Sequence, residues 1–185
     1  NYIFKEKLKL WNTIDDLTII APSVWMSNCI RKSKIFKNAN INIIPTGVDL
    51  NTFRDWGGSK LRINLELPLN KKLILFGSIN PYEDNRKGGK LLMKTLSLYE
   101  QNNNIELVIF GSSNIQKLYG SFKIHDLGYI NEDKQMANIY SACDVFVAPA
   151  IEENLANTVL EAMACGTTVV AFDIGGMKDI IDHKV

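Results

Sequence analysis

Short apolar runs alternate along the chain with longer segments that show helical periodicity. The runs are apolar at successive positions, which is typical of strands buried on both faces of a parallel sheet. The intervening segments place apolar residues three or four positions apart, as with Leu92, Thr95 and Tyr99 on one helix face. This alternation predicts an α/β fold, a Rossmann-like parallel sheet with helices on both faces.

The individual elements follow from the same pattern, from glycine-rich breaks and from capping residues. Residues 48–69 lack periodicity and contain Gly57, Gly58 and Pro68, so they are predicted to form a connection. A helix is expected over 23–33 with Ser23 as its N-cap. Further helices are expected over 90–99, 134–142 and 158–164, and strands over 17–21, 41–45, 72–76, 105–110, 123–127, 144–148 and 168–172.

Composition narrows the class of protein. The 185 residues are 46% hydrophobic and 22% charged, as in ordinary soluble domains, and the net charge of +1 argues against nucleic acid as a partner. Cys29, Cys143 and Cys165 each lie in an apolar stretch, which indicates reduced core thiols in a cytoplasmic protein. No apolar run is long enough to span a membrane.

Residues 149–166 carry the most informative chemistry. An apolar strand leads into a polar loop and then a helix, with Glu153 before the helix and Glu161 in its first turn. Asn157 or Thr158 is expected to start this helix. Backbone N–H groups at a helix start attract anions, and carboxylates accept hydrogen bonds from hydroxyls. An anion joined to hydroxyl groups describes a sugar nucleotide.

Both acids also have plainer interpretations. Thr158-x-x-Glu161 matches a capping box, in which the Glu side chain reaches back to the N-cap amide and needs no ligand. The functional alternative makes Glu161 an acceptor for two neighbouring ribose hydroxyls. Glu153 taken alone is most simply a solvated loop acid. Spacing alone leaves these alternatives open.

A second candidate element is Lys87-Gly88-Gly89, which follows Arg86. Cations at a helix start are unfavourable for the helix itself, so this basic pair is consistent with a bound anion. A solvated basic turn explains it equally well. Gly77 and Ser78, at the end of the preceding strand, could add backbone donors. No Gly-x-Gly-x-x-Gly or P-loop pattern occurs.

The sequence also lacks the motifs of other chemistries. It has no Asp-x-Asp, His-x-x-x-His or Cys-x-x-Cys, so neither a metal site nor a cofactor is expected. His125 and His183 lie near no nucleophile motif, and Gly-x-Ser-x-Gly is absent. His125 is therefore predicted to be a surface or packing residue.

Taken together, these motifs resemble the retaining group 1 (family 4) glycosyltransferases of the GT-B fold. Their hallmark Glu-x7-Glu stands here as Glu153 and Glu161, and 161–170 reads Glu-Ala-Met-Ala-Cys-Gly-Thr-Thr-Val-Val. Lys87-Gly88 is similar to the family's Lys-Gly. Residues 44–49 resemble its Ile-Pro-Asn-Gly-Val-Asp, and Gly175-Gly176 stands at the expected place.

The resemblance implies a division of the chain. Residues 1–52 would be the tail of the N-terminal acceptor domain and 53–71 the interdomain connection. Residues 72–185 would be the nucleotide-sugar domain, incomplete at its C-terminus, so this chain would bind donor without completing transfer. Two departures from the family are Asn154-Leu155-Ala156 in place of Gly-Phe-Gly, and Gly77-Ser78 in place of Gly-Arg. Arg86 is a candidate substitute for the absent arginine.

The resemblance also implies roles for residues. Glu161 would hold the ribose, while Lys87, Arg86 and amides at the helix start would neutralise the leaving diphosphate without metal. Glu153 and the backbone of 154–156 would hold the sugar. The expected catalytic residues are therefore Glu153, Lys87 and Arg86, and the expected donor-binding residues are Glu161, Asn154, Leu155, Ala156, Asn157, Thr158, Gly77, Ser78, Gly128 and Tyr129.

The implied reaction is transfer of a sugar from a nucleotide-diphosphate sugar to a hydroxyl of an unidentified glycan or glycolipid, with retention, in polysaccharide or glycolipid synthesis. A cytoplasmic location at the inner membrane face is expected, with any peripheral contact made through the N-terminal domain. Two alternatives stay open: a sugar-nucleotide epimerase of the GT-B fold, and a non-catalytic module that binds nucleotide sugars.

Overall fold

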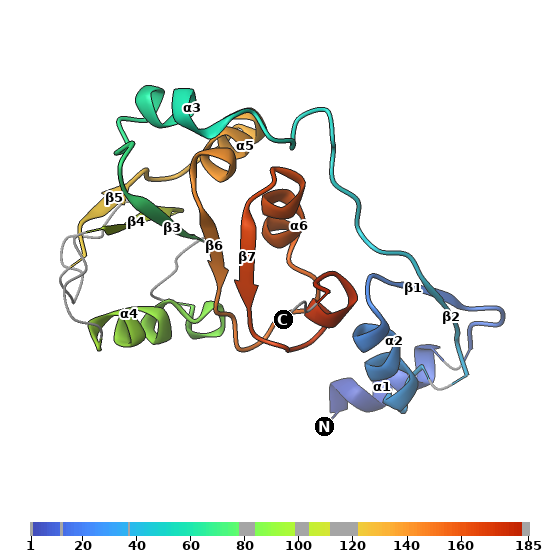
Figure 1. Cartoon of the computed structure of the whole chain (residues 1–185). Coiled ribbons are helices and arrows are strands. Elements are labelled where there is room, and N and C mark those ends of the chain that lie inside the picture. Colours follow the sequence, from blue (N-terminus) through green and yellow to red (C-terminus); the bar gives the residue numbers. More distant parts are fainter. Residues whose placement is uncertain are drawn as a thin grey trace. The chain divides into compact units, whose positions relative to one another are not determined.

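The computed structural model describes residues 2–11, 13–36, 38–77, 84–98, 104–111 and 122–182 (Figure 1). The chain forms two compact units. Unit 1 comprises residues 1–46, 153–155 and 173–185, and unit 2 comprises residues 47–152 and 156–172. Each unit is described by itself below.

Unit 2 is built around a five-stranded parallel sheet in the order β5-β4-β3-β6-β7. The chain adds β4 and β5 on one side of β3 and then places β6 and β7 on its other side. Because every pair is parallel, all five carboxyl ends meet at one edge of the sheet. The predicted α/β class is confirmed. The strands are β3 (Lys72–Gly77), β4 (Ile105–Phe110), β5 (Ile124–Asp126), β6 (Val145–Ala148) and β7 (Thr168–Ala171).

Helices cover both faces of this sheet, which explains why its strands are apolar at successive positions. On one face, Leu92 and Met93 of α4 (Gly89–Ser97) pack in a core with Ile109 of β4. The next residue of β4, Phe110, points to the opposite face and meets Tyr140 of α5 (Asp133–Ala142) edge-on. Figure 1 shows α4 and α5 on opposite sides of the strands, with α6 (Asn157–Ala164) beside β7.

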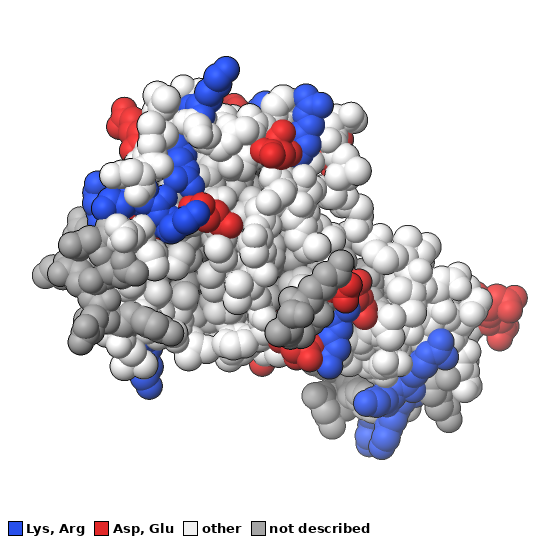
Figure 2. Space-filling view, viewed as in Figure 1, with Lys and Arg blue, Asp and Glu red and all other residues white. Residues whose placement is uncertain are grey.

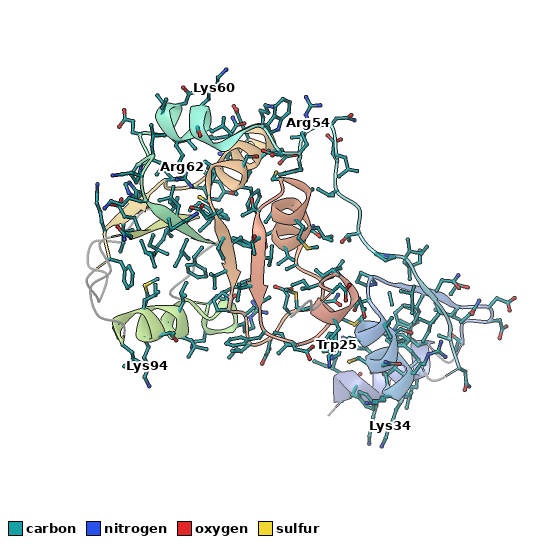
Figure 3. The ribbon with its side chains drawn as sticks, viewed as in Figure 1. Trp25, Lys34, Arg54, Lys60, Arg62 and Lys94 are labelled. Carbon is teal, nitrogen blue, oxygen red and sulfur yellow. The ribbon has the colours of Figure 1, made fainter. Side chains whose placement is uncertain are left out.

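The prediction that residues 48–69 form only a connection is wrong, because a helix, α3 (Gly58–Asn64), lies within them. Tertiary contacts rather than local pattern hold this helix. The Arg62 guanidinium donates from Nε to the Ala142 carbonyl at 2.7 Å and from NH2 to Asp144 Oδ2 at 2.8 Å. Figure 3 shows Arg62 extending from α3 toward the body of unit 2. No residue of α3 is fully buried. A helix with no buried face needs no apolar stripe, and the sequence pattern therefore gave no sign of it.

Unit 1 contains a two-stranded parallel sheet of β1 (Thr18–Ala21) and β2 (Asn40–Ile43). The helix α2 (Val24–Lys32) connects the two strands in sequence. Ser23 is its N-cap as predicted, since Ser23 Oγ accepts from the Met26 amide at 3.0 Å. The unit also contains α1 (Tyr2–Trp11), which the sequence pattern did not predict, and the 3-10 turn η2 (Met177–Asp179).

Two of the three cysteines are buried and one is exposed. All three cysteines are free, and Cys143 and Cys165 are buried as expected, whereas Cys29 is exposed, so its prediction as a core thiol is wrong. In Figure 2, Lys/Arg and Asp/Glu atoms are interspersed over a largely uncharged visible face, in keeping with the net charge of +1. None of the helices described here has the length and apolar character needed to cross a bilayer.

Candidate functional site

The carboxyl ends of β3 and β6 define the candidate site of unit 2. The strand order reverses at β3, since the chain leaves toward β4 and returns on the other side as β6. The loops after the two strands therefore diverge, and open α/β sheets bind ligands at this switch point. Lys87 and Gly88 belong to the segment after β3, and Pro149 begins the segment after β6.

Lys87-Gly88 is built into this edge by contact with the β6 loop. Residues Asn85–Lys87 form the 3-10 turn η1, and Gly88 follows with a left-handed φ of 72°. A Cβ on Gly88 would lie 1.8 Å from the Pro149 carbonyl oxygen, so only glycine fits. The Ile151 amide donates to the Arg86 carbonyl at 2.8 Å. The backbone after β3 is thus fastened to the backbone after β6, and Lys87 is half-buried at this junction.

Arg86 is held in an ion pair. Its Nε and NH2 donate to the two oxygens of Asp84 at 3.0 and 2.8 Å, and Asp84 also caps η1 through the Arg86 amide. The hydrogen bond from the Arg86 side chain holds the pKa of Asp84 below its ordinary range. A phosphate at Arg86 would have to share the guanidinium with this carboxylate.

The start of α6 differs from the capping-box interpretation, which is wrong. The N-cap is Ala156, no side chain caps the helix among the described residues, and Thr158 is the second helical residue rather than the cap. Glu161 instead accepts a hydrogen bond on Oε2 from the Tyr140 hydroxyl at 3.0 Å. Burial raises the pKa of Glu161, and the bond from Tyr140 opposes that rise. The Glu161 carboxylate is therefore held by Tyr140 of α5 and not by a capping box in its own helix.

The ends of β4 and β5 are joined through Gly128. Its carbonyl accepts from the Gly111 amide at 2.7 Å, its amide donates to Asp126 Oδ1 at 2.9 Å, and its φ is 65°. Tyr129 follows with 61% of its surface exposed. At the end of β3, Gly77 is buried, and a Cβ there would lie 2.5 Å from the Phe110 ring. Ser78, the other donor-binding residue predicted at this strand end, lies outside the described residues.

His125 is paired with a carboxylate on a neighbouring strand. His125 Nε2 lies 2.5 Å from Oε2 of the buried Glu106, across β5 and β4, so the prediction of a packing residue is confirmed. His183 lies outside the described residues.

Glu153, Asn154 and Leu155 belong to unit 1, where they form a tightly held loop. Asn154 Oδ1 accepts from Ser23 Oγ at 2.8 Å, and Glu153 Oε1 accepts from the Asn154 amide at 3.0 Å. Gly175 and Gly176 pack directly on this loop. Added Cβ atoms would lie 1.7 Å from the Glu153 carbonyl oxygen and 2.0 Å from that of Asn154. The Gly-Gly pair is therefore required by backbone contact with the loop that carries Glu153.

The predicted site residues thus divide between the units. Sequence reasoning missed Tyr140, although a tyrosine on a helix face that packs against a sheet signals a hydroxyl in need of a partner. It also missed Ser23 as a partner of Asn154, a bond for which local sequence gives no signal. Unit 1 holds Glu153, Asn154 and Leu155, whereas unit 2 holds Gly77, Arg86, Lys87, Gly128, Tyr129, Ala156, Asn157, Thr158 and Glu161.

Across the described ranges, no three His, Cys, Asp or Glu side chains are grouped as they would be to hold a metal ion.

The parallel sheet with its switch point at β3 places unit 2 among the doubly wound α/β domains, which bind ligands outside the carboxyl ends of their strands. The family model for glycosyl transferases of group 1 matches residues 70–185. The chain therefore belongs to the group 1 glycosyltransferase family, whose solved members among its structural neighbours have the GT-B fold.

Individual relatives agree with this assignment. An uncharacterized glycosyltransferase of Methanocaldococcus jannaschii is 33% identical over 124 residues, which is 63% of this chain and 31% of that protein. Sucrose-phosphate synthase from Thermosynechococcus elongatus superposes with a TM-score of 0.73 at 24% identity, covering 95% of this chain and 46% of that one. The Anabaena protein HepE, solved with UDP and glucose, gives 0.73 at 21% identity, covering 97% and 50%. The chain thus spans about a third of the length of the Methanocaldococcus jannaschii protein and about half of the length of these two solved proteins.

Proposed function

We propose that the protein is a retaining glycosyltransferase of family 4, which moves a sugar from a nucleotide-diphosphate sugar to an acceptor hydroxyl. The observation that carries the proposal is the junction of the β3 and β6 loops, where Gly88 meets Pro149 and sets Lys87 at the switch point. Family membership supports the transfer chemistry, and HepE, a structural neighbour, binds UDP and glucose.

Each part of the donor has a group suited to it. The cation of Lys87 and the start of α6, near Asn157 and Thr158, suit a diphosphate, because the positive end of a helix dipole attracts anions. Glu161, with two carboxylate oxygens, suits the vicinal hydroxyls of ribose. Gly128 and Tyr129 stand at the adjoining strand end. Glu153 and the backbone of 154–156 are proposed to hold the sugar hydroxyls.

The proposed reaction needs mainly positioning and stabilisation of the leaving group. As the bond between the anomeric carbon and the diphosphate breaks, negative charge grows on the phosphate oxygens that face Lys87. The acceptor hydroxyl oxygen then bonds to the same carbon on the same face of the sugar, and its proton passes to the departing diphosphate, which leaves as the nucleoside diphosphate. This role requires no metal, because a lysine and backbone amides supply the positive potential.

The chain itself is proposed to bind donor without completing transfer. It spans about half the length of the two solved proteins. The sheet of unit 1 has two strands within the described residues, whereas the sheet of unit 2 has five. The acceptor, a glycan or glycolipid, and a cytoplasmic location at the inner membrane face belong to the whole protein in this proposal.

Replacing Lys87 with alanine tests the phosphate role. Losing a charged hydrogen bond to the diphosphate should weaken UDP binding by about 10- to 100-fold and leave uridine binding within about twofold. Isothermal titration with the two ligands measures this difference. Lys94→Ala is the matched control, since Lys94 extends from α4 away from the sheet and should change neither affinity (Figure 3). Equal losses for UDP and uridine in Lys87→Ala would contradict the proposed role.

A thermal-shift screen of UDP-, GDP- and ADP-sugars identifies the donor base. A ligand present at 100 times its dissociation constant should stabilise the chain by about 2.7 kcal/mol. A chain that responds to none of the three does not bind donor as proposed.

A further inference from the structure

We propose that Tyr140 is the positioning residue for Glu161: its hydroxyl fixes the carboxylate in one orientation, so that Glu161 discriminates ribose from deoxyribose. This inference rests on the proposed nucleotide site. It assigns a role to a fully buried residue on a different helix, with no contact to the ligand required.

The tyrosine ring is fixed on several sides. Tyr140 has no exposed surface and lies in the last turn of α5. Its ring meets Phe146 at 5.6 Å and Phe110 at 6.2 Å between centroids, both nearly perpendicular. Its backbone carbonyl accepts from Thr167 Oγ1 at 2.7 Å. The hydroxyl therefore stands at a defined point, 3.0 Å from Glu161 Oε2.

Packing alone does not account for the hydroxyl. A phenylalanine would make the same aromatic contacts without placing a polar atom in the core. Here the polar atom is matched by a carboxylate that is itself half-buried, and burying a carboxylate costs more than burying a hydroxyl. A core that gains nothing from this pair would do better with two apolar residues. The pairing thus indicates that the orientation of Glu161 matters for binding.

The bond leaves the carboxylate able to accept further hydrogen bonds. Each carboxylate oxygen has two lone pairs, so Glu161 can accept from Tyr140 and from two vicinal hydroxyls at once. Burial keeps the pKa of Tyr140 far above its ordinary value, so the phenol remains a donor at neutral pH. A carboxylate already fixed by one donor loses less side-chain freedom when a ribose binds.

The groups facing Glu161 set the direction of its pH response. Burial raises its pKa, the Tyr140 hydrogen bond lowers it, and the negative charge of Asp133 on α5 raises it. Cys165, after α6, also faces the carboxylate, and burial raises the pKa of its thiol to about 11, so it is neutral near pH 7. Removing the Tyr140 hydroxyl should therefore move the pKa of Glu161 upward.

Tyr140→Phe tests the proposal, with ligand pairs that differ only in the 2′-hydroxyl: UDP and 2′-deoxy-UDP, GDP and 2′-deoxy-GDP, ADP and 2′-deoxy-ADP. In at least one of the three pairs, the wild type should bind the ribonucleotide about 10-fold more tightly than its 2′-deoxy counterpart. In Tyr140→Phe this preference should fall severalfold, with the deoxy ligand unaffected. The acid limb of ribonucleotide binding should move to higher pH, and carbon NMR of the Glu161 carboxyl should show the same shift without ligand.

Two further variants separate positioning from packing. Thr167→Val removes the hydrogen bond to the Tyr140 carbonyl without touching the hydroxyl, so it should lower stability and keep the ribose preference. Glu161→Gln should lose the preference and the acid limb together. If Tyr140→Phe keeps the wild-type preference and pH profile, the positioning role is overturned and the nucleotide site stands. If the wild type binds none of the six nucleotides, the proposed nucleotide site fails, and the role of Tyr140 fails with it.

Discussion

Both sheets of this chain contain strands with large aliphatic residues, but the burial of these residues differs sharply between the sheets. In β4, Leu107, Val108 and Ile109 are at most 1% exposed, whereas Ile20 of β1 is 63% exposed and Ile43 of β2 is 44% exposed. The difference lies in the number of neighbours, since β4 pairs on both sides and is covered on both faces, while β1 and β2 form a sheet of two strands within the described ranges. Apolar runs specify strands, but the burial of a strand depends on what packs against it.

Different kinds of interaction stabilise the interior of each unit. Unit 2 depends on side-chain packing around Phe76, Leu107 and Ile109, and on the aromatic cluster at Tyr140. Unit 1 relies more on specific polar contacts at the start of α2, where Ser23 bonds to Asn154 and the Val24 amide donates to Asp179. Substitutions in the two units should therefore differ in the size of their effects.

The largest contrast is expected between Leu107→Ala and Ile20→Ala. Leu107 is 1% exposed in the unit 2 core, so its truncation leaves a cavity and should cost about 2–5 kcal/mol. Ile20 is mostly exposed, so the same truncation should cost less than about 1 kcal/mol. Urea unfolding followed by circular dichroism measures both values. Comparable losses would mean that the exposure of β1 does not persist in solution.

A smaller effect is expected at Asp144, the polar anchor of unit 2. Asp144 accepts from Arg62 and the Leu73 amide, both at 2.8 Å, so it links α3 to the sheet. Burial alone would raise its pKa, but the hydrogen bonds from Leu73, Lys72 and Arg62 outweigh burial and lower it. Asp144→Asn should cost about 1–2 kcal/mol at pH 7.

The pH dependence of that effect has a definite sign. A carboxyl whose pKa is lower in the folded state stabilises the fold above its unfolded pKa, and this stabilisation is lost as the pH falls through the folded value. The difference between wild type and Asp144→Asn should therefore be constant at neutral pH and shrink below about pH 4. A difference that persists unchanged at pH 2 would show that the ion pair is not its source.

The smallest effect is expected for Ser23→Ala in unit 1. This change removes the N-cap of α2 and the bond to Asn154, and it should cost about 1 kcal/mol. Hydrogen exchange is the sharper measurement, because the amides of α2 should lose protection while those of β3 and β4 keep theirs. Ser33→Ala, beyond the other end of α2, is the control and should leave the Met26 amide protected. Equal loss of protection in both units would mean that the units unfold together.

The sequence predicted the sheet well because burial on both faces leaves a direct mark, an unbroken apolar run such as 105–110. It did not predict α3, because Arg62 holds that helix through contacts with Ala142 and Asp144, far away in the chain. At the site, the glycines Gly88, Gly175 and Gly176 could be recognised as a pattern, but not the carbonyls that require them. The partner of Glu161 also lay outside local sequence, where Thr158 suggested a cap that α6 does not use.

The contacts at the start of α2 also bear on the order in which the chain folds. The Ser23–Asn154 bond spans 131 residues and the Val24–Asp179 bond spans 155. During synthesis, residues 18–43 emerge well before Gly176 and Asp179, which follow all of unit 2. Contacts of such high sequence separation are slow to form, because a long loop must close before they stabilise anything. Although β1 and β2 are synthesised before unit 2, they are thus expected to be among the last parts of this chain to reach their native contacts, and they would depend on chaperones until Gly176 and Asp179 arrive.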